Sequence, residues 1–150
     1  MPELKKILCL ANSRKHSERC VAGIDLDSGT WIRPVNLEGK ALSDRDISFQ
    51  NGGRPQVLDI IQVPVLKPEP LCYQPENWLI DKEYYWGKTD NKKTDVLSNY
   101  EDDDPFILRG ASDRLSVSGL QQNPITKSLM LIKQRDVTFT KTRSYSGRLQ

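Results

Sequence analysis

The chain has 150 residues, of which 37% are hydrophobic and 28% are charged, and its formal net charge is +2. This length suits one domain with one core, and apolar residues grouped in short clusters exclude a wholly disordered chain. No run of about 18 apolar residues exists to span a membrane, and no signal-peptide core follows the first residues. Three cysteines, an odd number, argue against a disulfide framework, so we expect a cytoplasmic protein.

The charge is distributed unevenly along the chain. Residues 105–150 carry eight Lys or Arg against two acids, whereas residues 76–104 carry four against nine. Basic segments at the two ends are compatible with a phosphate backbone as partner, and equally with solvated surface that binds nothing.

The N-terminal third predicts short strands separated by turns. Residues 6–11 form an apolar run that ends at turn formers, as a buried strand does. Residues 12–19 predict a polar loop, and residues 21–35 predict a hairpin that turns at residues 27–29. Pro34 donates no backbone hydrogen bond, so we expect it at a strand end, an edge or a bulge.

The middle of the chain alternates turns with one long strand. Residues 42–47 predict a short helix capped by Ser43. Residues 57–66 predict a long strand that is interrupted by Pro64. Residues 67–75 contain three prolines and predict an extended connector.

The C-terminal half predicts less regular structure. Residues 90–104 are polar and acidic and predict a surface loop. Residues 129–133 and 137–142 predict strands, the second with strict alternation. A turn at residues 146–147 would begin a return strand and leave a strand edge unpaired. The elements together favour an all-β barrel or sandwich with minor helix.

Nucleophilic catalysis needs a nucleophile and a base within hydrogen-bond reach. His16 is the one histidine, and no glycine-framed nucleophile elbow surrounds the neighbouring Ser13 and Ser17. Asp102 to Asp104 lie in the predicted acidic loop rather than on an ordered element, which disfavours a two-metal hydrolytic site. We therefore expect no enzyme and no cofactor.

A zinc site is also disfavoured by spacing. Cys9, His16, Cys20 and Cys72 could supply four ligands, but structural zinc sites use close pairs two to four residues apart. Small buried strand residues are the better interpretation of Cys9 and Cys20. We expect no metal.

The best candidate for binding is the predicted loop at residues 12–19. It carries side chains suited to phosphate oxygens or base edges, namely Asn12, Ser13, Arg14, Lys15, His16 and Arg19. Trp31 and Arg33 share one face of the next strand and could stack a base and bind its phosphate. The alternative places Trp31 in the core and Arg33 in a surface ion pair.

A second polar and aromatic cluster follows the proline connector. It consists of Gln74, Glu76, Asn77, Trp78 and Asp81. Either it forms a ligand wall, in which Asn77 and Trp78 would contact the ligand, or it closes one mouth of the barrel.

Several of these residues together resemble the prokaryotic dual OB-containing domain family. The matching positions run in order through the first 80 residues: 10–13, Lys15, His16, 19–23, Gly29, 31–35, 58–60 and 74–78. The resemblance implies OB-like barrels that recognise nucleic acid or nucleotides, in proteins tied to bacterial conflict or antiphage systems. It makes residues 12–19 and the Trp31–Arg33 pair the expected family signature.

We therefore predict an all-β fold with an OB-like small barrel, and an incomplete second one, within a single globular unit over residues 1–150. The OB-like core covers about residues 4–82, the acidic loop about 90–104 and a second, partial β unit about 105–150. The second barrel is expected to be truncated, completed by another copy, or supplied by a separate protein.

The predicted function is a non-catalytic sensor that binds single-stranded nucleic acid or a nucleotide, with DNA, RNA and small nucleotides left open. The alternative is a protein-interaction module that dimerises or recruits a partner through its C-terminal strand edge. No membrane partner is expected.

Overall fold

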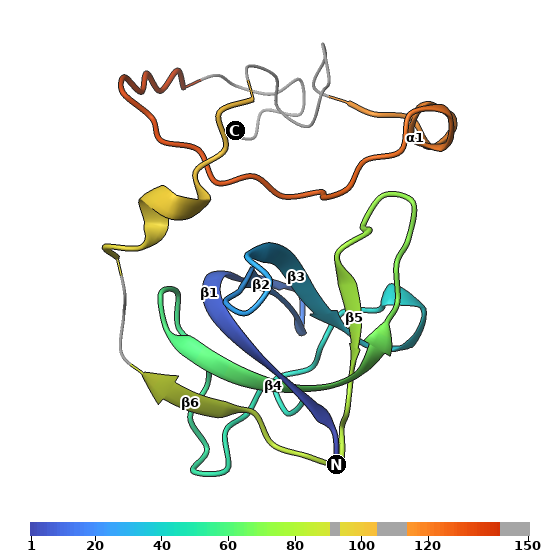
Figure 1. Cartoon of the computed structure of the whole chain (residues 1–150), viewed down its shortest axis with the longest axis vertical. Helices are drawn as coiled ribbons and strands as arrows, with labels where there is room; N and C mark the ends of the chain where they lie inside the picture. The colour runs from blue at the N-terminus through green and yellow to red at the C-terminus, as the bar shows by residue number, and fades with distance from the viewer. Residues whose placement is uncertain (91–93, 105–113, 142–150) are drawn as a thin grey trace.

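A computed structural model describes residues 1–90, 94–104 and 114–141 (Figure 1). Within these ranges, six strands lie in one sheet, and short helical turns and one α-helix accompany them. The strands are β1 (Glu3–Lys15), β2 (Glu18–Asp25), β3 (Thr30–Val35), β4 (Ile60–Pro68), β5 (Asn77–Ile80) and β6 (Gly87–Asp90). The helical segments are η1 (Leu37–Gly39), η2 (Leu97–Tyr100) and α1 (Val117–Gln122).

Five of the strands close into a barrel. The order across the sheet is β1-β2-β3-β5-β4-β6, and a further pairing of β1 with β4 joins the two sides. β3 and β5 are parallel, whereas the other neighbours are antiparallel. A closed five-stranded barrel with this order is the OB fold, so the predicted all-β, OB-like barrel is confirmed.

Closure depends on β1, which serves two neighbours. Its residues Glu3 to Leu8 pair with β4, and its residues Ile7 to Lys15 pair with β2. The register with β2 shifts between Cys9 and Ala11. Because a bulge bends a strand and increases its twist, this irregularity lets one strand leave β4 and continue beside β2.

The polar segment at residues 12–19 is not a loop, which corrects the sequence-based prediction. β1 continues to Lys15, β2 begins at Glu18, and only His16 and Ser17 form the turn. His16 has a φ of 57°, the left-handed conformation that lets so short a turn close. Polar residues continue the strands here because both faces of this hairpin tip are exposed to solvent.

The predicted hairpin at residues 21–35 is confirmed as β2 and β3. Pro34 is the residue before the end of β3, opposite Trp78 of β5. Pro64 lies inside β4, next to the register shift between Val65 and Lys67. Pro34 is thus near a strand end and Pro64 is beside an irregularity in the pairing, which are positions where a residue without a backbone N–H is tolerated.

Two predicted elements differ in the structure. The strand predicted from residue 57 begins at Ile60, because Leu58 has a φ of 74° and lies in a turn. The helix predicted at residues 42–47 is wrong, since this segment is a turn. Its reciprocal caps are nevertheless formed: Ser43 N donates to Asp46 Oδ2 (2.8 Å) and Asp46 N donates to Ser43 Oγ (3.2 Å).

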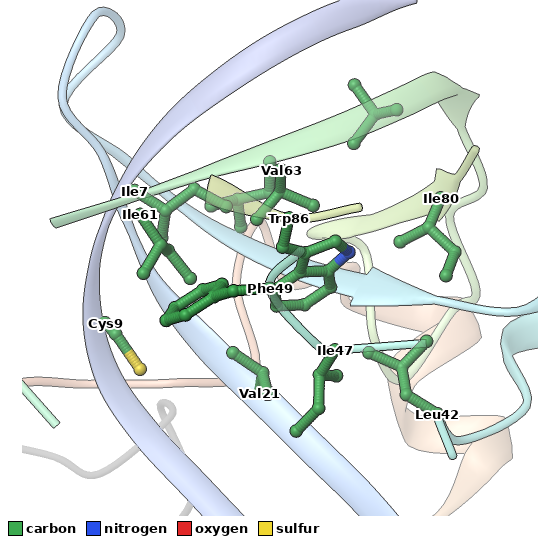
Figure 2. Close-up of a cluster of buried hydrophobic side chains, with 12 residues drawn as sticks. Ile7, Cys9, Val21, Leu42, Ile47, Phe49, Ile61, Val63, Ile80 and Trp86 are labelled. Atoms are coloured by element: carbon green, nitrogen blue, oxygen red, sulfur yellow. The ribbon is translucent and has the colours of Figure 1, made fainter. Parts of the chain in front are cut away.

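One apolar cluster fills the barrel interior, and every strand except β6 contributes side chains to it. The largest side chain in the cluster belongs to Trp86, the residue just before β6. Figure 2 shows the indole of Trp86 next to Phe49 and Ile47 within this cluster. Trp86 is 2% exposed, and its backbone N donates to Ser48 O (3.3 Å). Burial of such side chains is the main favourable term in folding.

A second apolar row crosses the outside of the barrel. Ile60 of β4 lies opposite Leu8 of β1, Leu8 opposite Ile24 of β2, and Ile24 opposite Trp31 of β3. Leu8, Ile24 and Ile60 are each at most 2% exposed although they point away from the core cluster. The chain after β6 lies over this side of the barrel (Figure 1), and residues 99–102 and 126–127 line one cavity with Ile24 and Trp31.

The described residues after β6 contain no strand. The strands predicted at residues 129–133 and 137–142 are therefore wrong over 129–133 and 137–141, where the chain is irregular, and residue 142 lies outside the described residues. The predicted turn at residues 146–147 also lies outside them. The second, partial β unit at 105–150 stays a prediction. Within the described ranges, no helix has the length and apolar character needed to cross a membrane.

Replacing Gly23 with Ala should destabilise the barrel. An added Cβ would lie 2.0 Å from Leu8 O and 2.8 Å from an Ile7 methyl group, so β1 and β2 would have to separate. Overpacking of this kind costs about 1 to 3 kcal/mol. Urea denaturation measures the loss.

The matched control is Gly87→Ala in β6. Its Cβ would meet only the Gln62 side chain, at 3.5 Å or more, which is ordinary contact. Equal midpoints for the two variants would contradict the close approach of β1 to β2.

Candidate functional site

The exposed tip of the β1–β2 hairpin carries four of the predicted binding residues. Ser13, Arg14, Lys15 and His16 are exposed. Arg14 Nε donates to His16 O (3.2 Å) across the turn. Asn12 lies further from the tip, half-buried, and its Nδ2 donates to Pro55 O (2.8 Å), so it joins the hairpin to the β3–β4 connection rather than facing solvent.

Three arginines gather around Asp44 beside this tip. Arg19 Nε lies 2.6 Å from Asp44 Oδ1, and Arg54 Nη1 lies 3.3 Å from Asp44 Oδ2. The Arg19 hydrogen bond holds the pKa of Asp44 below its usual value, with the charges of Arg54 and Arg14 acting in the same direction. One carboxylate therefore balances one charge of three, and we call Arg14, Arg19 and Arg54 the arginine cluster.

The neighbouring carboxylate, Asp46, is also committed internally. Its Oδ2 accepts from Ser43 N (2.8 Å) and Asn36 Nδ2 (3.2 Å), and Lys82 Nζ lies 3.6 Å from its Oδ1. Burial alone would raise the pKa of Asp46, but the hydrogen bonds from Ser43 and Asn36 and the charge of Lys82 lower it overall. Asp46 therefore neutralises little of the cationic surface at the tip.

Two further cations extend the arginine cluster. Lys15 lies at the hairpin tip, and Arg45 lies between the two committed carboxylates; both are exposed. Neither makes an ion pair with a carboxylate in the part of the chain that the structure describes. This end of the barrel consequently presents guanidinium and ammonium groups that can meet an anion from solvent.

Arg33, in contrast, is locked inside the protein. It is 11% exposed, and its Nη2 lies 3.1 Å from Oε1 of Glu76, which is 1% exposed. Nη1 donates to Cys20 Sγ (3.2 Å) and Nη2 to Ser128 Oγ (3.0 Å). The alternative of an ion pair, left open by the sequence, is the one the structure shows, although this pair is buried rather than at the surface.

The same carboxylate holds the C-terminal segment on the barrel. Glu76 Oε2 accepts from Ser128 N (3.0 Å), and Glu76 Oε1 accepts from Ser128 Oγ. Asp102 ties residues near η2 to the same C-terminal segment, because its carboxylate accepts hydrogen bonds from Leu131 N (2.9 Å) and from Lys127 Nζ. Asp102 was expected in a solvated loop, yet its side chain is 13% exposed and fully engaged.

Trp31 of β3 is half-buried and lies opposite Ile24, near the end of β2 that is far from the hairpin tip. It lines a cavity of about 480 Å³ together with Ile24, Tyr100, Thr126 and Lys127. Trp31 and Arg33 do share the outer face of β3, as predicted, while Ile32 points into the core. Ile24, the partner of Trp31, lies five positions along β2 from Arg19, a distance of roughly 17 Å along a strand.

The predicted site is therefore divided. The cations are at the hairpin tip, the indole of Trp31 is at the far end of β2, and the C-terminal segment crosses between them at Ser128. A single nucleotide cannot contact both ends at once.

The cluster after the proline connector is structural. Asn77 is fully buried, and its Nδ2 donates to Gln74 Oε1 (3.3 Å), so its side chain does not face solvent; the ligand contact expected of Asn77 stays a prediction. Trp78 is half-buried against the core cluster, and Lys5 Nζ lies 4.4 Å from its ring centroid. With Glu76 also internal, this cluster supports the barrel rather than a ligand wall.

Two features bear on chemistry at this barrel, namely the Cys9 thiol and the grouping of possible metal ligands. Burial raises the pKa of the Cys9 thiol to about 12, with the nearby charge of Asp59 adding to the effect, so its thiolate is not populated at neutral pH. Among the residues with described positions, no three His, Cys, Asp or Glu side chains group as metal ligands would.

Sequence reasoning missed Arg54, Arg45 and the exposed tyrosines before β6. Arg54 follows two glycines in a turn, and Arg45 lies in the segment that was predicted as a helix. No pattern in the neighbouring residues indicated that these side chains would lie close to the hairpin. The backbone pairing of Arg19 N with Leu42 O (2.6 Å), and of Leu42 N with Arg19 O, places the segment that carries Arg45 beside β2, and this long-range contact leaves no local signal.

The family comparison agrees with the barrel. The model of the dual OB-containing domain family matches residues 5–150. The chain belongs to this family. No curated protein and no solved structure matches the chain. Membership of an OB-containing family is compatible with nucleic-acid binding, since OB barrels bind oligonucleotides.

Within this dual OB domain, the described residues form one closed barrel. OB barrels commonly bind oligonucleotides on the face of strands 2 and 3. Here that face carries the buried outer row and is covered by residues of the same chain. The hairpin tip with the arginine cluster is an open cationic surface of the described barrel.

Glu76→Ala should destabilise the protein and release the C-terminal segment. Removing one partner of a buried ion pair leaves an uncompensated charge, here Arg33, which costs about 3 to 5 kcal/mol. Urea denaturation measures the stability, and hydrogen exchange at the Ser128 amide measures the release.

Lys40→Ala, which removes an exposed ion pair with Glu38, is the control and should leave both readouts unchanged. Unaltered protection of the Ser128 amide in Glu76→Ala would show that Glu76 does not hold this segment.

Proposed function

We propose that the protein is a non-catalytic module that binds single-stranded nucleic acid through the arginine cluster at the tip of the β1–β2 hairpin. The observation that carries the proposal is the pairing of Arg19 and Arg54 with the single carboxylate of Asp44, beside the exposed Arg14 at the hairpin tip. Guanidinium groups in excess over carboxylates form a site for phosphate oxygens.

The shape of the site favours a strand over a mononucleotide. The cations extend from Lys15 and Arg14 to Arg45 and Arg54 across two segments of the chain, and no enclosed phosphate cradle surrounds any one of them in the described structure. OB barrels bind about 4 to 16 nucleotides each. A flexible backbone with repeated phosphates can follow such a surface, whereas one nucleotide would contact part of it.

Cellular role and location are further parts of the proposal. The resemblance of residues 10–35 and 74–78 to the prokaryotic family supports a sensor in a bacterial conflict or antiphage system, acting in the cytoplasm. In such a role the domain would recognise nucleic acid and leave any chemistry to partner proteins.

A protein-interaction module remains the second candidate. Its support is a groove of about 760 Å³ in which Leu37 and Leu66, 63% and 56% exposed, lie beside Leu79. β6 also lies at the edge of the sheet. The C-terminal strand edge first expected as the docking element is not a strand over residues 137–141. Light scattering that shows a stable dimer would favour this alternative.

The variant Arg14→Gln/Arg54→Gln should weaken oligonucleotide binding without unfolding the protein. Both side chains are exposed or half-exposed, and Arg19 remains to pair with Asp44. For single strands each lost phosphate contact lowers the slope of log affinity against log salt by about 0.7, so the slope should fall by about 1.4. Fluorescence anisotropy with labelled single-stranded DNA and RNA across salt concentrations measures it.

Lys67→Gln/Lys133→Gln removes the same charge at exposed positions outside the cluster and is the matched control. If both double variants reduce affinity and slope equally, binding follows net charge rather than this site.

A further inference from the structure

Two tyrosines before β6 are exposed on a rigid backbone. Tyr84 and Tyr85 are 46% and 61% exposed, whereas the next residue, Trp86, is 2% exposed in the core. Trp86 forms a bridge with Phe49, and Glu83 N donates to Asp81 Oδ1 (3.0 Å) at the preceding turn. The barrel thus fixes the segment at both sides while leaving the two rings in solvent.

The tyrosines line a cavity with two cationic side chains. The cavity is about 380 Å³ and is bounded by Arg45, Asp46 and residues 82–85. This volume lies within the range of small-ligand sites. Asp46 is already occupied by Ser43, Asn36 and Lys82. Arg45 is the cation that can meet a phosphate there, and the carboxylate of Glu83 also lines the cavity.

The cavity adjoins the arginine cluster. The turn at residues 44–47 connects them: Asp44 faces Arg19 and Arg54, while Arg45 and Asp46 line the cavity. Phosphate-binding groups and exposed aromatic rings therefore lie on the two sides of one tight turn. A single strand of nucleic acid presents phosphates and unstacked bases in the same alternation.

We propose that this cavity receives a base of the single strand whose phosphates the arginine cluster binds, with Tyr84 or Tyr85 stacking on the base. The proposal rests on the function proposed above and adds base contacts to it. Aromatic stacking accepts any base, because every base has a π face. The site should favour bases that stack strongly without reading their hydrogen-bonding edges.

A protein partner is the competing occupant, because tyrosine and arginine are also enriched at protein interfaces. The observations favour nucleic acid on two grounds. Arg45 makes no ion pair with a carboxylate among the described residues, and the adjacent arginine cluster carries two charges that Asp44 does not balance.

The test compares Tyr84→Ala/Tyr85→Ala with Tyr84→Phe/Tyr85→Phe in the full chain. Anisotropy measures binding to an oligodeoxyadenylate of about 12 nucleotides and to an abasic strand of equal length. We expect the alanine variant to lose about tenfold in affinity for the oligodeoxyadenylate and nothing for the abasic strand. The phenylalanine variant should bind both as the wild type does, since its rings still stack.

Three outcomes would overturn the inference. If Arg14→Gln/Arg54→Gln weakens binding but the alanine variant does not, the base site is wrong and the proposed function stands. If the alanine variant loses equally on both strands, the tyrosines do not stack on bases. If the wild type binds neither strand but self-associates until the tyrosines are removed, the cavity is a protein interface and the proposed function fails as well.

Discussion

The buried carboxylate of Glu76 determines which face of this barrel is open. It pairs with Arg33 on β3 and accepts two hydrogen bonds from Ser128, so one side chain neutralises a buried charge and fixes the C-terminal segment. That segment lines one cavity with Ile24, a member of the outer apolar row, and with Trp31. Removal of Glu76 would leave Arg33 without its countercharge and would also remove the hydrogen bonds to Ser128. The stability of the ion pair and the attachment of the C-terminal segment therefore depend on the same side chain.

Because the chain itself covers the β2–β3 face, the hairpin tip is the end of the barrel at which a ligand could bind. There the two carboxylates of one turn are both occupied: Asp44 is shared between arginines, and Asp46 by Ser43, Asn36 and Lys82. Sharing keeps the turn in place while leaving a surplus of positive charge at the surface. The same arrangement that stabilises the β3–β4 connection therefore leaves cationic groups at the surface, which the proposed binding of a polyanion requires.

The sequence predicted the barrel, the β2–β3 hairpin and the shared face of Trp31 and Arg33, because alternation and turn residues are local signals. It did not predict that β1 continues through residues 12–15, since polar exposed residues carry no strand pattern. The internal pairing of Arg33 depends on Glu76, 43 residues later, and on Ser128, 95 residues later. Contacts at such separations leave no mark in a local pattern, and the same reason hid Arg54 and Arg45.

The most direct test of this account is amide hydrogen exchange with and without a saturating single-stranded oligonucleotide. The account predicts added protection at residues 13–19, 43–54 and 82–86, and unchanged exchange at Ser128 and Leu131. Protection confined to β3 and residues 126–131, or release of the Ser128 amide on binding, would contradict it. Either result would mean that the ligand enters the face now covered by the chain itself.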